Sequence, residues 1–222
     1  MTPSALLSRF RSRVRDEALP YMWTDADFYE YLDTSQKDFA RYSGGIGDAR
    51  SGATYIRLRA GVSYYPLSPK IMKVRAAVRE DNGDDIQILN EENQSDAGIR
   101  RTDSAGLVKT LIVGSDQDFV RVSPVPSADE EGKNIRLTVY RMPLNDIVDG
   151  NSELEIQEHH HIHLLDGVLS YAHRKQDAET FDKGRADQFT ALFQAYCGQA
   201  KAERERREYK PRGVQFGDGG CW

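Results

Sequence analysis

The sequence predicts an α+β protein: an antiparallel helical bundle of two N-terminal and two C-terminal helices, with a small antiparallel β-sheet or sandwich inserted between its halves. Two observations predict this class. Apolar residues recur at helical spacing over residues 1–44 and again over 157–209. Over residues 53–143 they alternate with polar residues, which is typical of half-exposed strands. Residues 210–222 are expected to form an extended tail, and residues 1–222 a single domain.

Composition allows a hydrophobic core and disfavours several classes of protein. The 222 residues are 39% hydrophobic, and the two cysteines, Cys197 and Cys221, make neither a disulfide framework nor a zinc ligand set. The 30 basic and 35 acidic residues give a net charge of −5, which argues against a protein that mainly coats nucleic acid. No segment resembles a signal peptide or reaches the roughly 20 apolar residues of a membrane span, so we expect synthesis in the cytoplasm and no membrane partner.

The N-terminal helical hairpin is predicted from its capping residues. The first helix is expected over Pro3–Ala18, because Pro3 suits a first turn and Pro20 prevents continuation. The second helix follows Thr24, which stands three residues before Asp27 in a weak capping-box arrangement. Gly44 and the glycine after it end this helix.

The central region is predicted to contain strands separated by turn-rich stretches. The segments with a period of two are Ala53–Ala60, Lys73–Arg79, Asp85–Leu89, Val108–Val113, Phe119–Ser123 and Asn134–Tyr140. The acidic turn Asp81–Asp85 lacks the ligand spacing of a calcium loop and is expected to be a solvated hairpin tip. Gly44–Gly47 lacks the Gly-Lys-Ser/Thr ending of a phosphate-binding loop and is expected to be a flexible connector.

Helical spacing returns after Pro143. Two helices, Gln157–Gln176 and Asp182–Tyr209, are predicted to form an antiparallel pair, because short loops place consecutive helices side by side. The second of them loses its apolar stripe after Ala200, so its end should stand clear of the core. Cys197 lies on its apolar face, where burial should raise the pKa of the thiol and keep it unreactive.

The run His159–His163 is the strongest local signal for chemistry. In a helix, His159 and His163 would stand four residues apart on one face, where two imidazoles can share a metal ion. The run has no Glu in the His-Glu-x-x-His arrangement, and a third ligand would have to come from a distant segment. A structural role is therefore favoured, and we assign no catalytic, cofactor-binding or metal-binding residue. A small metal-dependent hydrolase using His159 and His163 is the alternative.

The end of the last helix is a second candidate site. Lys201–Arg212 holds six basic and three acidic residues. The interleaved Glu203, Glu205 and Glu208 favour a solvated helix with opposite-charge pairs over phosphate contact. A nucleic-acid-binding accessory protein is thus the less favoured hypothesis, and DNA affinity that falls steeply with salt would indicate it.

The tail carries apolar side chains that its own sequence cannot bury. Val214, Phe216 and Trp222 follow Arg212 in a glycine-bearing segment. This pattern is expected when a tail docks on a partner. Folding of the tail back onto its own bundle is the alternative.

Several segments resemble the head-to-tail adaptor proteins of tailed bacteriophages, which are also called connector or head-completion proteins. In chain order, the segments are Ser8–Asp16, Tyr21–Asp27 with the helix after it, the proline-ended strands Asp118–Pro126 and Ile135–Pro143 around an acidic loop, His159–His163 at the start of a helix, and Asp177–Asp187 leading to Phe189–Tyr196. The resemblance spans most of the chain in the right order. The long charged final helix and the aromatic tail depart from the plainer members of the family.

The resemblance implies a structural virion protein and not an enzyme. It implies a dodecameric ring of identical copies at the head–tail junction, assembled in the host cytoplasm, with the portal ring on one side and tail nozzle or tube proteins on the other. The ring would extend the DNA channel and help retain packaged DNA until ejection, and DNA would pass without specific binding. In relatives a C-terminal arm climbs onto the portal, so Arg212, Val214, Phe216 and Trp222 are the expected docking residues. The family implies no cofactor.

Overall fold

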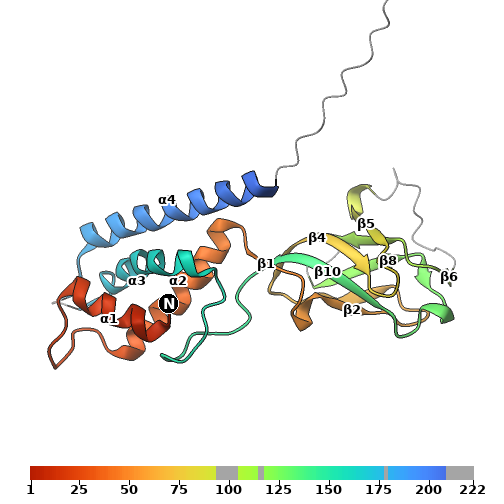
Figure 1. Ribbon diagram of the computed structural model, residues 1–222. Helices are drawn as coiled ribbons and strands as arrows, with labels where there is room; N and C mark the ends of the chain where they lie inside the picture. Colours follow the sequence, from red (N-terminus) through yellow and green to blue (C-terminus); the bar gives the residue numbers. More distant parts are fainter. Residues whose placement is uncertain (94–104, 115–117, 178–179, 209–222) are drawn as a thin grey trace, which may run out of the picture.

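A computed structural model describes residues 1–93, 105–114, 118–177 and 180–208, and these residues form two lobes that lie end to end (Figure 1). The helical lobe contains the α-helices, and the sheet lobe contains most of the strands. The chain crosses between the lobes at β1 (Ile46–Asp48) and after β10 (Asn134–Arg141). The predicted tail, with Arg212, Val214, Phe216 and Trp222, lies outside the described residues. The mixture of α and β elements confirms the predicted class.

The first helix, α1 (Pro3–Val14), is shorter than predicted. It begins after Thr2, whose hydroxyl accepts a hydrogen bond from the Ala5 N–H at 3.3 Å. It ends because Arg15 adopts a left-handed conformation with a φ of 57°, which turns the chain before the predicted end at Ala18.

The second helix, α2 (Asp25–Ser43), has the predicted boundaries. The Thr24 hydroxyl accepts a hydrogen bond from the Asp27 N–H at 3.1 Å, and the Asp27 carboxylate accepts one from the Thr24 N–H at 2.9 Å. This reciprocal pair confirms the predicted capping box. Gly44 ends the helix with a φ of 84°, a conformation that glycine adopts without steric strain.

The C-terminal helices are α3 (Leu164–Ala172) and α4 (Lys183–Glu208). They run antiparallel, because His163 stacks on Tyr196 near one end of the pair and His173 stacks on Phe189 near the other. The prediction of one helix from Gln157 was wrong at its start, where residues 158–163 form a 3₁₀ helix. No helix in the described part of the chain is long and apolar enough to cross a membrane.

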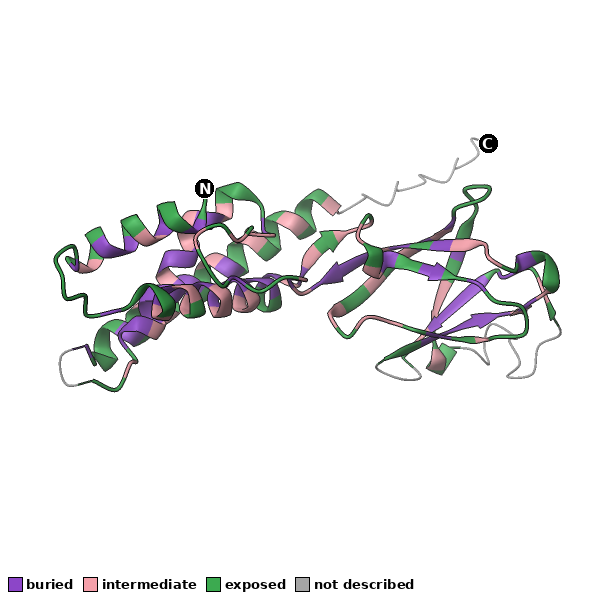
Figure 2. Cartoon of the chain, turned by 90° about the horizontal axis from the view of Figure 1, so that it is seen from below, coloured by how far each residue is buried: buried purple, intermediate pink, exposed green. Residues whose placement is uncertain are grey.

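One apolar core holds the helices together, and buried residues line the inside of both lobes (Figure 2). In the helical lobe α2 contacts each of the other three helices. At Gly167 of α3 an added β-carbon would lie 2.7 Å from the Ser35 hydroxyl of α2, so only glycine allows this approach of the two helices. The largest fully buried apolar side chains of the lobe are Leu6, Phe10, Phe28, Leu32, Leu164 and Leu165.

The strands form a curled, mostly antiparallel sheet. Besides β1 and β10 they are β2 (Tyr55–Arg57), β3 (Tyr64–Pro66), β4 (Ile71–Arg79), β5 (Asp85–Asn90), β7 (Thr110–Val113) and β8 (Phe119–Ser123). The order in the sheet is β1-β10-β4-β5-β7-β8-β3, and β2 also pairs with β10. A separate pair joins β6 (Ala105–Gly106) to β9 (Val125–Pro126). The strands β1, β3, β6 and β9 were not predicted.

The expected antiparallel sheet is confirmed in part, because two of the strand pairs are parallel. β5 and β7 pair in parallel, with Ile88 opposite Leu111, and the short strands β6 and β9 are parallel as well. The residues between β5 and β7 are numerous enough for the crossover that a parallel pair requires. The acidic turn after β4 is exposed as predicted, and Arg79 reaches back to bind Asp81 there.

The glycine segment after α2 is a strand and not the expected flexible connector. Ile46 pairs with Arg141, and Gly47 pairs with Tyr140. Gly45 has a φ of 99°, and a β-carbon there would lie 2.8 Å from the Tyr140 β-carbon. The glycines therefore let the backbone leave α2 and lie directly against β10.

Candidate functional site

The run His159–His163 does not have the geometry that a shared metal ion requires. It lies in a 3₁₀ helix, which has three residues per turn, so side chains four residues apart point about 120° away from each other. The expectation that His159 and His163 share one helical face was therefore wrong. Within the described segments, no group of three or more His, Cys, Asp and Glu side chains is arranged to hold a metal ion.

His161 binds backbone groups from two segments. Its side chain is buried, with Nδ1 2.9 Å from the carbonyl oxygen of Met1 and Nε2 2.9 Å from the carbonyl oxygen of Ile156. The N-terminal ammonium of Met1 lies 2.8 Å from the Glu158 carboxylate. These contacts hold the start of the chain against the entry to α3, which is a structural role.

His160 and His163 contact α4 through one tyrosine. Nδ1 of His160 lies 2.8 Å from the Tyr196 hydroxyl, and the ring of His163 stacks on the Tyr196 ring with centroids 3.6 Å apart. Phe39 of α2 packs against both His160 and Tyr196, with ring centroids 4.8 and 6.4 Å away. Burial lowers the pKa of His160 to about 4, so this ring is neutral near pH 7. The histidine run therefore joins three helices.

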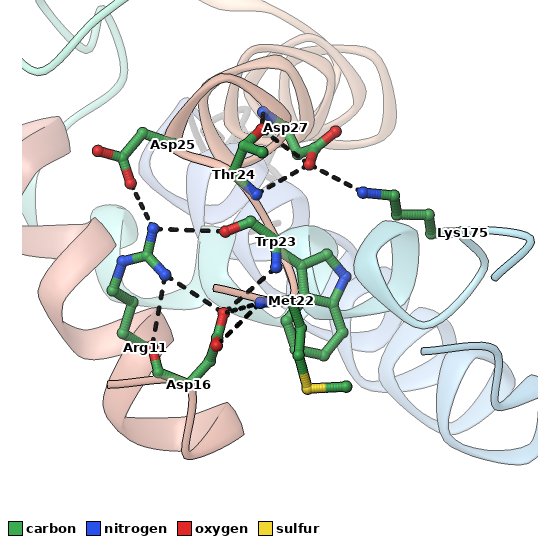
Figure 3. Close-up of polar contacts among 8 residues, drawn as sticks. All are labelled: Arg11, Asp16, Met22, Trp23, Thr24, Asp25, Asp27 and Lys175. Atoms are coloured by element: carbon green, nitrogen blue, oxygen red, sulfur yellow. Dashed lines mark hydrogen bonds and ion pairs between the residues drawn. The ribbon is translucent and has the colours of Figure 1, made fainter. Parts of the chain in front are cut away.

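The turn between α1 and α2 is built on a buried ion pair (Figure 3). Nη1 of Arg11 donates to the Asp16 carboxylate at 3.2 Å, and Nη2 donates to the Trp23 carbonyl oxygen at 3.4 Å. Asp16 also accepts hydrogen bonds from the N–H groups of Met22 and Trp23 at 3.0 and 3.2 Å. Arg11 further pairs with Asp25. These residues belong to the segment that resembles phage adaptors, and they fix its shape.

The same turn is tied to the C-terminal half of the helical lobe. The indole N–H of Trp23 donates to the carbonyl oxygen of Ala172 at 3.1 Å, and Lys175 binds the capping residue Asp27 at 2.9 Å. Burial alone would raise the pKa of Asp27, but hydrogen bonds with Lys175 and Thr24 outweigh it and lower that pKa. The N-terminal hairpin and α3 are thus fixed to each other at this end (Figure 3).

The opposite end of the helical lobe meets the sheet lobe through α4. The Arg204 guanidinium lies 4.3 Å from the centroid of the Tyr140 ring of β10 and donates to the Gly45 carbonyl oxygen at 2.7 Å. Glu208 pairs with Arg75 of β4 at 3.1 Å and accepts from the Tyr140 hydroxyl. The prediction that the end of this helix stands clear was therefore wrong, because its last turns bind the sheet lobe.

A second set of charges connects the lobes behind this contact. Arg141, the last residue of β10, binds Asp48 of β1 and Glu155 of the following loop, each at 2.5 Å. Burial alone would raise the pKa of Asp48, but hydrogen bonds from Arg50, Ser51 and Arg141 outweigh it and lower that pKa. Because Arg141, Asp48 and Glu155 are largely buried, loss of one would leave its partner without compensation.

A cavity lies at this junction. Its volume is about 520 Å³, and its lining combines apolar groups of α2, β1 and β10 with charges of α4. Arg204, Arg207 and Glu208 border it, so two basic residues of the predicted Lys201–Arg212 run lie beside the sheet lobe. The residues of that run after Glu208 lie beyond the part of the chain that the structure describes.

The sheet lobe contains a buried ion pair of its own. Arg79 of β4 donates to both oxygens of Glu130, at 2.6 and 2.9 Å, and the two side chains are 3% and 2% exposed. Arg79 lowers the pKa of Glu130 to about 2. Lys133 also binds Glu130 at 2.9 Å. No pattern in the sequence predicts this pair, because Glu130 lies in an acidic loop of the kind that is usually solvated.

The thiol of Cys197 is buried, as predicted. Cys197 is fully buried in α4, and burial raises the pKa of its thiol to about 12. This confirms the predicted burial of Cys197 and the predicted rise in the pKa of its thiol.

The two ends of the molecule expose different apolar side chains. At the far end of the helical lobe these are Leu19, Tyr21, Met22 and Phe181. On the sheet lobe they include Tyr55, Tyr64 and Phe119.

Comparison with known proteins identifies a family that covers almost the whole chain. The family described as SU10 adaptor protein matches residues 1–215. No curated protein matches the chain.

Proposed function

The chain belongs to the SU10 adaptor protein family, and from this premise we propose that identical copies of it form a ring between the portal and the tail of a bacteriophage virion and extend the DNA channel. The family identifies a structural adaptor of the phage particle. The proposed ring contains twelve copies, helps retain packaged DNA in the head and takes part in DNA ejection.

The two-lobed shape supports a ring. A closed ring of identical copies needs two different faces on each copy, and these faces must contact each other around the ring. The helical and sheet lobes offer chemically different surfaces, with exposed apolar groups on each. The buried ion pairs and the binding of α4 to β10 favour a rigid unit, in which residues 1–222 act as a single adaptor domain.

The partners follow from the family. We propose that the portal ring binds one side and the tail nozzle or tube proteins the other, in a particle assembled in the host cytoplasm. The tail residues Arg212, Val214, Phe216 and Trp222 are proposed to dock on the portal, because they include apolar side chains in a glycine-bearing segment that follows α4. DNA passes through the ring without sequence-specific binding.

The experiment that tests this proposal is a mass measurement in solution. The purified chain is measured alone and mixed with a portal ring, both at full length and cut after Glu208. Formation of a ring on the portal by the full chain, and its loss on truncation, is the expected result. A full chain that stays monomeric with the portal present would overturn the connector function, whereas normal binding by the truncated chain would overturn only the role of the tail.

A further inference from the structure

One side of the sheet lobe presents basic side chains in a row. Residues that pair directly in adjacent strands project to the same side of a sheet. Arg136 of β10 is opposite Tyr55 of β2, and Asn134 of β10 is opposite Arg57 of β2. Tyr140, further along β10, is opposite Lys73 of β4. We call the side that carries Tyr55, Arg57, Lys73 and Arg136 the cationic face.

The three basic residues of the cationic face are exposed, and their side chains form no ion pair or hydrogen bond with any described residue. Their situation differs from that of Arg79 and Arg141, which are paired and buried. The nearest carboxylate along the same side, Glu80, accepts a hydrogen bond from the Asn134 amide at 3.0 Å. The charges of Arg57, Lys73 and Arg136 are therefore available to a partner.

The row continues onto α4. Four residues along β10, about 14 Å from Arg136, the guanidinium groups of Arg75 and Arg204 lie 5.1 and 4.3 Å from the centroid of the Tyr140 ring. Glu208 neutralises the charge of Arg75 by forming an ion pair with it, whereas the positive charge of Arg204 is not part of that ion pair. Arg204 of α4 and the basic residues of the sheet thus form one strip, which no single segment of the sequence shows.

The composition of the strip identifies the partner. Protein interfaces are usually apolar and depleted of charge at their centre. Here the centre is formed by Asn134, Arg136 and Thr138, and the exposed aromatic groups Tyr64 and Phe119 of this side lie on β3 and β8, at the other end of the strand order. Arginine guanidinium groups are suited to paired hydrogen bonds with phosphate oxygens. A polyanion with evenly spaced charges fits this strip better than a protein surface does.

We propose that the cationic face contacts the phosphate backbone of duplex DNA and lines the channel of the ring. The inference rests on the proposed function and adds to it which side of the chain meets DNA. Phosphate contacts carry no sequence information, so such a surface guides DNA of any sequence. The neighbouring Glu80 and Glu208 keep the number of free cations per copy small, which suits a channel through which DNA must move.

The test measures the affinity of the full chain for a labelled duplex of mixed sequence between about 50 and about 200 mM salt. The test variant replaces Arg57, Lys73 and Arg136 with glutamine. The matched control replaces Arg9, Lys109 and Lys183 with glutamine. These three cations are also exposed and lack a described ion-pair partner, but they lie away from the face, so the net charge of the two variants is the same.

In a plot of log affinity against log salt concentration, the magnitude of the slope is expected to fall by about 2.7 in the test variant, because each lost phosphate contact lowers it by about 0.9. The slope of the control should change little. Unchanged circular dichroism and ring formation on the portal separate this effect from misfolding. Equal salt dependence in the two variants would overturn the inference. So would a test variant that binds DNA normally but no longer assembles, because the face would then contact a second copy. Failure of the natural chain to join the portal would overturn the proposed function and leave the DNA result to be judged separately.

Discussion

The guanidinium of Arg204 lies 4.3 Å from the centroid of the Tyr140 ring and, through its donation to Gly45, joins the last helix to the segment where the chain first enters the sheet lobe. Three parts of the sequence meet at this one side chain. The relative position of the lobes, and hence the shape that a ring would repeat, depends on it.

Replacing Arg204 with alanine is expected to free the last turns of α4. The cation–π contact and the hydrogen bond to Gly45 are together worth about 1–2 kcal/mol, so amide exchange over residues 201–208 should accelerate roughly tenfold. Hydrogen exchange measured by mass spectrometry checks this. Arg206→Ala is the control, because Arg206 is an exposed neighbour. Equal exchange in both variants would contradict the role of Arg204.

Replacing Arg11 with glutamine should destabilise the helical lobe by about 3 kcal/mol, because Asp16 would remain buried without its cationic partner. Denaturant unfolding gives the free energy directly. In the control Arg9→Gln, an exposed arginine of the same helix is removed, and the change should stay within about 0.5 kcal/mol. Similar values for the two variants would show that the network in Figure 3 contributes little.

The Arg79–Glu130 pair predicts a specific dependence on pH. Because Arg79 lowers the pKa of Glu130 from 4.5 to about 2, the ionised carboxylate stabilises the folded state above pH 4.5, and this contribution, about 3 kcal/mol, is lost as the pH falls through about 2. Glu130→Gln should lose stability at pH 7 and show a weaker fall below pH 4.5. Unfolding curves of both proteins from pH 7 to pH 2 test it, and parallel curves would disprove it.

His160 should titrate far below an ordinary histidine. Burial lowers its pKa from 6.5 to about 4, so the unfolded chain binds a proton at this residue between pH 6.5 and pH 4 while the folded chain does not. Stability contributed by the neutral ring is therefore complete above pH 6.5 and declines as the pH falls towards 4. Nuclear magnetic resonance of the ring protons measures the pKa, with the urea-unfolded chain as the reference. A folded-state value near 6.5 would contradict the packing of His160 against Phe39 and Tyr196.

Local signals in the sequence predicted the helices well. The capping box of Thr24 and Asp27 lies at the start of α2, and Gly44 lies at its end. Both boundaries therefore follow from a few neighbouring residues. The strand Phe119–Ser123 was predicted to the residue, since the apolar Val120 and Val122 alternate in the sequence with Arg121 and Ser123. The helix before α3 was less predictable, because i+3 and i+4 spacing are hard to separate over the short run that opens at Glu158.

Features that depend on distant residues could not be predicted in this way. The parallel pairing of β5 with β7, the strand β1 and the docking of Arg204 each need a partner from another part of the chain. The cationic face is a similar case, because Arg57, Lys73 and Arg136 come together only when β2, β10 and β4 pair. Of the candidate site, the sequence indicated the basic run of α4 and missed the sheet residues beside it.

The pairing of β1 with β10 has a consequence for how such a chain can vary. Ile46 and Arg141 are partners, so the sheet lobe leaves and rejoins the helices at one place. For the folding of the helical lobe, the sheet lobe acts as a loop whose two ends are already close together. The entropic cost of closing a loop grows only with the logarithm of its length. A longer, shorter or different insert between the same two points would therefore change the folding of the helices little, apart from the last turns of α4, which bind β4 and β10. The helical lobe can therefore accept different inserted domains at this place, each suited to a different partner.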